Sequence, residues 1–493
     1  MAKNNGGGNS LLKVILILLM VVMIAASGLL IWLSINLVNK EGTPSTRPQV
    51  STQAIPETTA PPTTETQPPE TTMPEPETVI ATATISAQGD LLMHKPVFDT
   101  CRQSDGSYNF ESLSRYVKDT VSSFDYAMAN LETTFGGDKY KYQGNPEFNC
   151  PDPLIDSVVD TGYDMLMTAN NHAADTTNDG IVRTVDVIRE AGIPALGTQL
   201  NGDEPKYSVV EINGIKVGMA CYTYGYSVSG DGTKFSLNGL AQIPDNGTVN
   251  FFMNNNPDKL YRLAEEHYAD MKADGAEATM FFIHWGTEYQ TTENATQNKM
   301  AQKLCDIGYD VIVGGHPHVV QPVELLESTV DPDHKTVCIY SLGNAVSNQR
   351  TGISDLFPAG YTEDGALFTV TFEKYSDGQV YMVGTDVIPT WVNMHQYNGP
   401  KEYNILPLIK DQEDQWQETF GLTDHHFTSC QKSYNRTMGI VGEGLTECQT
   451  YLAQEKEARE QYYYDLAFNP EKVATKPVQT VPETTAETLA PAA

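Results

Sequence analysis

The chain has 493 residues, a formal net charge of −32 and seven cysteines. This length is enough for one large or two medium domains together with appended segments. The strong negative charge argues against nucleic acid as a partner, because nucleic-acid-binding surfaces are basic. The chain also has no Cys-x-x-Cys pair, which argues against a zinc site built from thiolates.

The N-terminal region contains an apolar segment that is long enough to cross a bilayer. Residues 14–35 carry no charged side chain over about 22 positions. Lys3 and Lys13 precede the segment, so the positive-inside rule places the N-terminus in the cytoplasm. A signal peptide cleaved near residues 25–27 is the alternative, but the apolar run continues beyond a typical signal core. The sequence therefore predicts a single-pass anchor over residues 14–38 and a main domain outside the cell membrane.

Two segments have the composition of disordered chain. Residues 39–78 are rich in Thr, Pro and Glu and show no apolar periodicity, so we expect an extended stalk. Residues 475–493 have the same composition and are expected to form a disordered tail. Between them, we expect the main domain at residues 79–395 and a more helical C-terminal extension at residues 396–474.

The main domain shows alternating strand and helix patterns. Strands are expected at residues 79–87, 126–129, 165–168, 278–283, 311–313 and 337–341. Residues 207–221 predict a hairpin that turns at Asn213-Gly214, where positive φ is readily adopted. Helices are expected at residues 180–191, 258–273, 296–307 and 448–464. This alternation predicts an α/β domain in which helices cover the faces of the sheets.

The cysteines divide into two sets. Cys221, Cys305 and Cys338 lie in apolar contexts, which favours buried thiols. Cys101 with Cys150, or Cys430 with Cys448, could form disulfides, although their spacing does not decide it.

Side chains that can bind metal ions follow five of the apolar runs. In chain order they are Asp90 and His94; Asn130 and Glu132; Asn171, His172 and Asp175; His284 and Glu288; and His316 and His318. Ligands collect at the carboxyl ends of strands in α/β sheets, so we expect these groups around one pocket. Each group also has a structural alternative, such as a helix-capping aspartate, a buried salt bridge or a core histidine bonded to a carbonyl.

The strongest of these signals is His316-Pro317-His318, because two imidazoles flank a proline directly behind an apolar run. Neutral imidazole is the commonest transition-metal ligand in proteins. Imidazoles combined with carboxylates and a carboxamide suit Mn, Fe or Zn. Two such divalent ions, about 4 Å apart and bridged by one carboxylate, can activate water and stabilise a developing oxyanion. The motifs therefore predict a metal-dependent active site.

At this point the chain resembles the CapA-type capsule (poly-γ-glutamate) synthesis proteins, whose domain is related to calcineurin-like metallophosphoesterases. The resemblance covers about residues 80–390. It runs in order through Gly89-Asp90, Asn130-Leu131-Glu132, Asn170-Asn171-His172, His284-Trp285-Gly286, Gly315-His316-Pro317-His318 and Ser341-Leu342-Gly343-Asn344. It implies a four-layer αββα sandwich of the metallophosphatase type, here with an N-terminal transmembrane helix and a helical C-terminal extension.

The resemblance also implies roles for the motif residues. Asp90 and His318 would hold one divalent ion, whereas Asn171, His284 and His316 would hold a second, with Glu132 bridging the two. His172 would be the proton donor or oxyanion stabiliser. His94, Asn130, Asp175 and Glu288 are possible additional members of the site. The first phosphoesterase motif is Asp-x-His, whereas here His94 stands four residues after Asp90.

Two functions are consistent with these residues. The first is a membrane-anchored extracytoplasmic hydrolase or transferase that cleaves a phosphoester or γ-glutamyl amide in a cell-surface polymer or another anionic substrate. Membrane proteins of capsule synthesis are expected partners, and nucleic acid is not. The second is a non-catalytic component that binds, assembles or exports the polymer. The presence of His172 favours the enzyme.

Overall fold

The structure is a computed structural model, and it describes residues 76–230, 233–357, 359–396 and 400–473. The expected anchor, the tail and all but the last residues of the expected stalk lie outside the described residues. Within the described part of the chain, no helix has the length and apolar character needed to span a bilayer.

The first sheet combines parallel and antiparallel strands. Its order is β17 (Glu402–Pro407), β16 (Val380–His395), β15 (Asp364–Tyr375), β1 (Val79–Leu91), β2 (Tyr126–Asn130), β3 (Met165–Met167) and β4 (Ala195–Leu196), and β14 (Asn344–Val346) also pairs with β1. Strands β1 to β4 are parallel, whereas β15, β16 and β17 are antiparallel to their neighbours. The carboxyl ends of β1, β2 and β3 therefore lie at one edge of the sheet.

The second sheet is built in a similar way. Its order is β12 (Val323–Glu327), β13 (Lys335–Ile339), β11 (Val311–Gly315), β10 (Ala278–His284), β6 (Ile215–Ser227), β7 (Lys234–Ser236) and β8 (Ile243–Pro244), and both β5 (Tyr207–Ile212) and β9 (Phe251–Met253) pair with β6. Strands β6, β10, β11 and β13 are parallel, so β10 and β11 deliver their last residues to a common edge.

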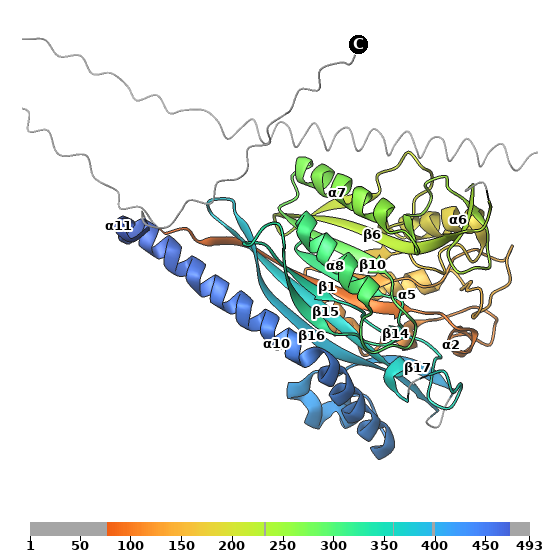
Figure 1. The fold of residues 1–493 in the computed structure, drawn as a ribbon. Helices are drawn as coiled ribbons and strands as arrows, with labels where there is room; N and C mark the ends of the chain where they lie inside the picture. The colour runs from red at the N-terminus through yellow and green to blue at the C-terminus, as the bar shows by residue number, and fades with distance from the viewer. Residues whose placement is uncertain (1–75, 231–232, 358, 397–399, 474–493) are drawn as a thin grey trace, which may run out of the picture. The chain divides into compact units, whose positions relative to one another are not determined.

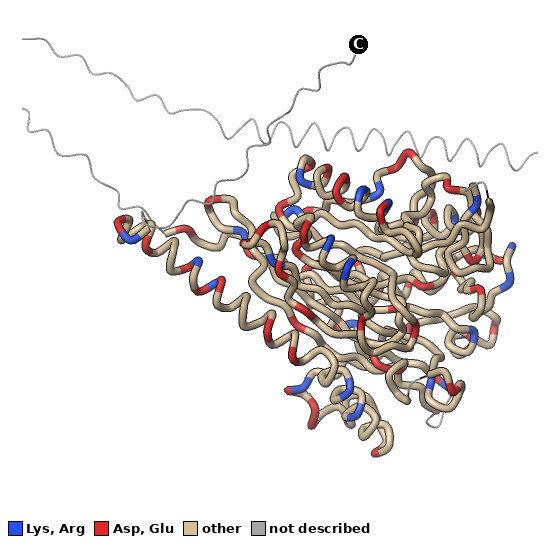
Figure 2. The backbone as a smooth tube through the Cα atoms, viewed as in Figure 1, with Lys and Arg blue, Asp and Glu red and all other residues tan. Residues whose placement is uncertain are grey.

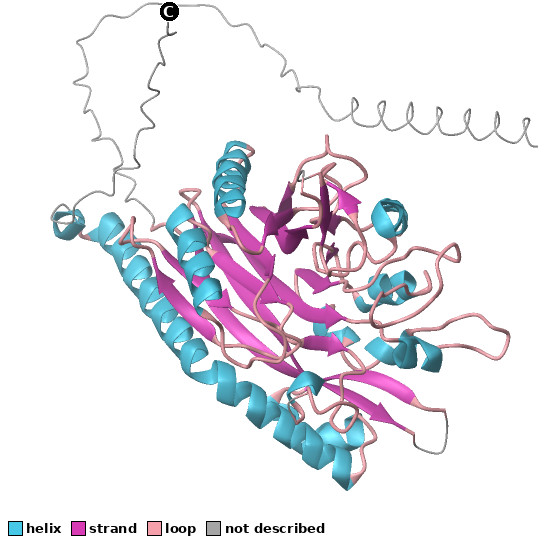
Figure 3. Ribbon diagram, turned by 45° about the vertical axis from the view of Figure 1, so that its right-hand side comes forward, coloured by secondary structure: helices cyan, strands magenta, loops and turns pink. Residues whose placement is uncertain are grey.

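The two sheets pack against each other between two layers of helices (Figure 3). The core between the sheets contains Ile85 and Phe368 of the first sheet with Met219 and Phe282 of the second. On the outer face of the first sheet lie α2 (Lys95–Thr100), α3 (Glu111–Ser114), α4 (Lys118–Val121), α5 (Leu154–Thr161) and α6 (Thr177–Glu190). On that of the second sheet lie α7 (Asp258–Ala273) and α8 (Ala295–Ile307). The four layers agree with the expected helix-sheet-sheet-helix order.

A long helix covers the side of the sandwich formed by β16 and β12 (Figure 1). This helix, α10 (Asp424–Phe468), follows α9 (Trp416–Thr419) and precedes α11 (Pro470–Val473). Its Val441, Leu445 and Leu452 side chains join the core between the sheets. A Cβ atom added to Gly444 would lie 1.8 Å from the Val323 carbonyl oxygen, so only glycine permits this approach to β12.

The expected strands and helices are confirmed with ends that differ by a few residues, except that the helix expected at residues 448–464 is only part of the 45-residue α10. The hairpin turns as expected, because Asn213 and Gly214 have φ angles of 49° and 86°. Strands β15, β16 and β17 were not predicted, and β17 brings the first part of the expected C-terminal extension into the first sheet. Neither possible disulfide forms, since all seven cysteines are buried free thiols.

Candidate metal centre

The centre begins at Asp90, the penultimate residue of β1. A Cβ atom on the preceding Gly89 would lie 2.0 Å from the Gly343 carbonyl oxygen, so a side chain there would push the two strands apart. The close approach lets the Asp90 N–H donate to Gly343 O at 3.0 Å. The pairing of β1 with β14 shifts register between Asp90 and Leu91, as at a β-bulge. The Asp90 carboxylate is buried as a result.

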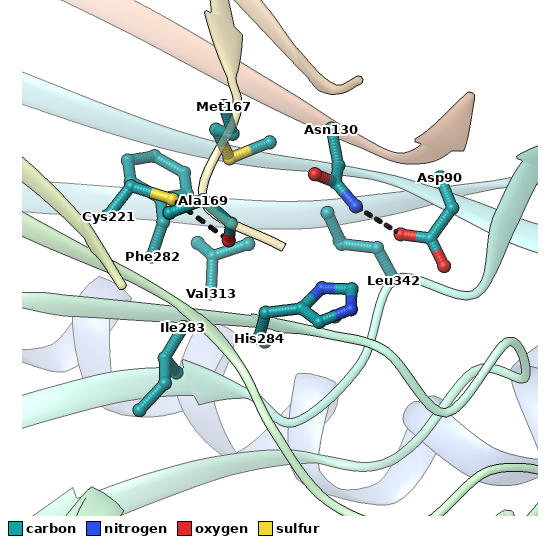
Figure 4. Close-up of a pocket in the computed structure, with 12 residues that line it drawn as sticks. Asp90, Asn130, Met167, Ala169, Cys221, Phe282, Ile283, His284, Val313 and Leu342 are labelled. Carbon is teal, nitrogen blue, oxygen red and sulfur yellow. Dashed lines mark hydrogen bonds between the residues drawn. The ribbon is translucent and has the colours of Figure 1, made fainter. Parts of the chain in front are cut away.

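Asp90 is held by Asn130 at the end of β2 and by His318 in the loop after β11. His318 Nδ1 lies 3.0 Å from Asp90 Oδ2, and Asn130 donates to Asp90 Oδ1 at 2.7 Å (Figure 4). The Asn130 amide also donates to Glu132 Oε2 at 3.3 Å. Burial raises the pKa of Asp90, but the hydrogen bond and charge of His318 outweigh it and hold that pKa below its usual value. Asn130 thus connects the two carboxylates.

Glu132 lies at the middle of the cluster with 0% of its surface exposed. Its Oε1 atom is 3.4 Å from His284 Nε2 and 4.0 Å from His318 Nε2. That oxygen is buried and has no hydrogen-bond partner. Burial, and then the charge of Asp90, raise the pKa of Glu132 well above its usual value. A carboxylate in this position needs either a proton or a cation.

Two further imidazoles, those of His284 and His316, face the same space, and burial favours their neutral form. His284 Nε2 lies 2.8 Å from Asn171 Oδ1, and His316 Nε2 lies 3.2 Å from the Tyr224 hydroxyl. Burial lowers the pKa of His284 to about 3 and that of His316 well below its usual value. His316 Nδ1 is buried without a hydrogen-bond partner. Neutral imidazole is the protonation state that binds a metal.

The loop that carries His316 and His318 has an unusual backbone. His316, His318 and the facing Tyr289 have positive φ angles of 98°, 58° and 65°. Such angles disfavour residues with a side chain, and they occur mainly where the surrounding structure imposes them. Here the Tyr289 N–H donates to Pro317 O at 2.8 Å. The fold therefore holds both imidazoles in a conformation that the free loop would avoid.

The cluster contains two sets of potential metal ligands. Asp90, Glu132 and His318 form one set, and Glu132, His284 and His316 form the other. Within each set, the ligand atoms all lie within 4.8 Å of one another. Carboxylate oxygens with neutral imidazole nitrogens form a donor set that suits Mn, Fe or Zn. Together with the unpartnered atoms of Glu132 and His316, this shows that the residues fit metal ions, with Glu132 common to both sets.

An apolar cavity lies beneath the cluster (Figure 4). Its volume is about 20 Å³, which leaves room for little more than one water molecule. Its polar lining includes Asp90, Asn130 and His284, and its apolar lining includes Met167, Cys221, Phe282, Val313 and Leu342. Such a floor excludes much of the solvent from one side of the cluster, which strengthens the electrostatic interactions of charges placed there.

His172 lies beside the two ligand sets and is oriented by Asp175. His172 Nδ1 is 2.8 Å from Asp175 Oδ2, and 11% of the His172 side chain is exposed. Asp175 also accepts the Phe148 N–H at 2.5 Å and a hydrogen bond from the Asn238 amide. The Phe148 ring packs edge-on against the His172 ring at 4.6 Å. Asp175 therefore orients His172 and takes no place in either ligand set.

Two of the possible additional residues stand outside the ligand sets. His94 Nδ1 accepts the Asn348 N–H at 3.3 Å, and its ring packs against Phe148 at 5.0 Å. Burial lowers the pKa of His94 to about 3. Glu288 is exposed at the surface beyond His284. Neither belongs to a ligand set among the described residues.

Three residues that contact the site residues were not predicted from the sequence as members of the site. Asn170 donates to Leu131 O at 2.8 Å and to Asn130 Oδ1 at 3.1 Å, and so joins the loops after β2 and β3. Its position in the Asn-Asn-His motif could have identified it as a site residue. Tyr224 reaches His316 from β6, but a strand tyrosine more often belongs to the core. Asn238 comes from a loop with no motif, so only the fold reveals its contact with Asp175.

Comparison with known proteins agrees with these features. The sequence model of the family described as "Bacterial capsule synthesis protein PGA_cap" matches residues 84–349. The chain is 27% identical to the capsule biosynthesis protein CapA of Bacillus anthracis, over 54% of this chain and 60% of that protein. It is 25% identical to the PGA biosynthesis protein CapA of Bacillus subtilis (strain 168), over 67% of this chain and 78% of that protein.

A solved structure similar to this chain is the NAD nucleotidase NadN of Haemophilus influenzae, with a TM-score of 0.37 and 10% identity, covering 77% of this chain and 60% of that one. The family match includes every strand-end motif from Asp90 to Asn344. The chain therefore belongs to the bacterial capsule synthesis protein family PGA_cap.

Proposed function

We propose that this protein is a metal-dependent hydrolase or transferase that acts on a cell-surface polymer during capsule synthesis. The single observation that carries the proposal is Glu132 Oε1, a buried carboxylate oxygen without a hydrogen-bond partner that is common to two sets of ligand atoms. A carboxylate of this kind is costly to bury unless something outside the chain neutralises it. Two divalent cations would do so.

The ligand atoms divide naturally between two ions. Asp90 and His318 would hold the first ion, and His284, His316 and the Asn171 amide oxygen would hold the second, with Glu132 shared. A bound pair of divalent ions activates water and stabilises negative charge on the group under attack. The chain supplies the spacing, the neutral imidazoles and the apolar floor.

In this proposal His172 is the residue that transfers a proton or stabilises an oxyanion. Asp175 Oδ2 already accepts the Phe148 N–H and, as an acceptor, fixes the Nδ1–H tautomer of His172. This leaves His172 Nε2 as the ring atom that exchanges a proton with the reacting group, or hydrogen-bonds to an oxyanion. The Phe148 ring restricts rotation of the imidazole. The Asn238 amide donates to Asp175 and so helps to hold the carboxylate that orients His172.

For the substrate, we propose a poly-γ-glutamate-like polymer, cleaved or transferred at a phosphoester or a γ-glutamyl amide. The name of the Bacillus subtilis relative supports this class. The chain itself is acidic, and acidic and basic side chains are interspersed along α7 and α10 (Figure 2). The bound cations would then provide the attraction for a polyanion. A membrane anchor at residues 14–38 and membrane partners of capsule synthesis remain part of the proposal.

The test combines metal content with turnover. The purified protein is assayed on an aryl phosphate and on γ-glutamyl peptides, and its metal is measured by elemental analysis. His172→Ala is expected to keep its metal and lose about 100-fold or more in turnover, whereas Glu132→Ala is expected to lose both. His425→Ala is the matched control, because His425 is exposed on α10. If His172→Ala and Glu132→Ala both restore capsule formation in a deletion strain, catalysis is the wrong account and a polymer-binding or assembly role replaces it.

A further inference from the structure

A second pocket, here named the Thr287 pocket, lies beside the metal centre. Its volume is about 250 Å³. Three elements supply its walls: the end of β9, the loop after His284, and the first turns of α8. The lining residues are Phe252, Asn254, Trp285, Gly286, Thr287, Asn294, Thr296, Gln297 and Met300. Because Thr287 is three residues after His284, the pocket opens at the same strand-end edge as the centre.

The lining of the Thr287 pocket is polar but uncharged. No Asp, Glu, Lys or Arg is among its lining residues, and neither Glu288 nor Lys299 lines it. The N-terminus of α8 offers no free site for an anion either, since the Asn294 side chain accepts the N–H groups of Thr296 and Gln297. A carboxylate or phosphate bound here would lose water without gaining a cation, which is unfavourable. The pocket therefore selects against charged groups.

The polar groups at its rim suit hydroxyl and amide partners. Thr287 and Thr296 are exposed. The Thr287 hydroxyl accepts a hydrogen bond from the Asn294 amide at 3.4 Å and can still donate one, and the Thr296 hydroxyl can both donate and accept. The Asn254 amide donates to the Tyr226 hydroxyl at 3.0 Å, which fixes its orientation. Deeper in the pocket, Gln297 donates to Gln321 at 2.8 Å. The interior is thus rigid, while the rim keeps hydrogen-bonding capacity for a ligand.

The Thr287 pocket is linked to the metal centre through two tyrosines. The Tyr226 ring packs edge-on against Tyr224 at 5.7 Å, and the Tyr224 hydroxyl lies 3.2 Å from His316 Nε2. Tyr226 in turn contacts Asn254 at the pocket rim. A chain of contacts through the two tyrosines therefore connects the pocket rim with His316 of the metal centre.

We propose that the Thr287 pocket binds an uncharged sugar unit, bearing hydroxyl and N-acetyl groups, that belongs to the substrate or acceptor of the metal centre. Its rim groups match such a unit, and its neutral lining disfavours a glutamate carboxylate. This inference rests on the proposed function, because it treats the strand-end edge as the substrate-binding edge. It adds that one of the two molecules joined or cleaved there is a neutral glycan.

Calorimetric titration of the full-length protein in detergent tests the inference with two probes, N,N′-diacetylchitobiose and γ-linked triglutamate. We expect the disaccharide to bind at least about tenfold more tightly than the triglutamate. Thr287→Val and Thr296→Val each remove one hydroxyl and are expected to weaken disaccharide binding about fivefold to tenfold. Thr446→Val is the matched control, because Thr446 lines a different surface groove between β12 and α10, and its affinity should equal that of the wild type.

Three results would overturn the inference: tighter binding of the triglutamate, no binding of the disaccharide by the wild-type protein, or unchanged affinity in both threonine variants. The same titration with Glu132→Gln separates this inference from the proposed function. Glu132 does not line the Thr287 pocket, so disaccharide binding should persist even where turnover is lost. Turnover of the aryl phosphate without disaccharide binding would leave the proposed function intact and reject the glycan pocket.

Discussion

Two regions of this protein bury carboxylates, and they neutralise them in different ways. Beneath α10, Asp364 has 2% of its side chain exposed and receives two contacts of 2.6 Å from the Arg436 guanidinium. Ser433 adds a third hydrogen bond at 2.7 Å. At the metal centre, Asp90 and Glu132 are equally buried, but no Lys or Arg of the described chain forms an ion pair with either.

The difference separates a site whose charges are balanced within the chain from a site whose charges are not. Asp364 has its counter-charge within the chain, so the pair ties α10 to β15 whatever the solution contains. Asp90 and Glu132 face imidazoles whose neutral form is favoured at His284 and His316. His318 counters part of the charge of Asp90, but the charge of Glu132 must be balanced by a proton or by cations from outside. The first region should therefore respond to mutation alone, whereas the second should respond to metal ions.

The largest effect is expected for Arg436→Met, which removes the counter-charge of Asp364. Loss of one partner of a buried ion pair costs about 3–5 kcal/mol in free energy of unfolding. Burial raises the pKa of Asp364 to about 7 even with Arg436 present. Because the Arg436 charge lowers this pKa, removing Arg436 should raise it further. A folded-state pKa above the unfolded value means that stability is lost as pH rises. Urea denaturation should therefore show a larger loss at pH 8 than at pH 5.

The opposite pH trend would show that Asp364 stays ionised without Arg436. Ser429→Ala provides the control, because the Ser429 hydroxyl donates only to a backbone oxygen of the same exposed helix turn.

The next largest effect is expected from added metal. Manganese or zinc ions at 100 times their dissociation constant should raise the free energy of unfolding by about 2.7 kcal/mol. Thermal denaturation of the chelator-treated protein with and without each ion measures this. Arg436→Met should show the same metal-dependent gain, since it leaves the centre untouched, whereas Glu132→Gln should show little gain. An equal metal-dependent gain in stability in the wild type, Arg436→Met and Glu132→Gln would show that the ions bind elsewhere.

A smaller effect of opposite sign is expected for Glu132→Gln without metal. The pKa of Glu132 is raised well above its usual value by burial and by Asp90, so its contribution to stability falls as pH rises. Glutamine carries no charge, and the variant should be more stable than the wild type by about 1–2 kcal/mol at pH 8 in chelator. Urea denaturation at pH 5 and pH 8 should show that gain only at the higher pH. A loss of stability at both pH values would mean that Glu132 is structural.

The smallest effect is expected at the surface of α10. Lys456 contacts Glu373 of β15 at 2.6 Å, and 33% of the Lys456 side chain is exposed. Exposed ion pairs contribute about 1 kcal/mol or less. Lys456→Met should therefore lower the free energy of unfolding far less than Arg436→Met does. A similar loss in both variants would contradict the distinction between buried and exposed pairs.

Much of the fold could be predicted from the sequence, because the strands that build the centre are short apolar runs followed by polar loops. The 258–273 helix and the Asn213-Gly214 hairpin were predicted because their local signals agree with the final structure. The strands β15 and β16 were not, although Phe368, Val370 and Phe372 alternate along β15. The length of α10 was also underestimated, because its apolar face is narrow and is defined by contact with both sheets.

The convergence of the site residues could be predicted, but their partners could not. Asp90, Glu132, His284, His316 and His318 meet as expected, because parallel strands end at one edge. The place of His94 outside the ligand sets depends on its contacts with Asn348 and Phe148, which no local pattern reveals. The same holds for the contact between Asn238 and Asp175. Motifs identify residues that follow strands, whereas tertiary structure decides which of them face one another.

The central claim is that Glu132 lies between two divalent cations. Crystals grown with manganese and measured at its absorption edge test this claim most directly. We expect two anomalous peaks about 4 Å apart, one beside Asp90 and His318 and the other beside His284 and His316, with Glu132 contacting both. The absence of a peak at this cluster, with manganese bound elsewhere or not at all, would contradict the account.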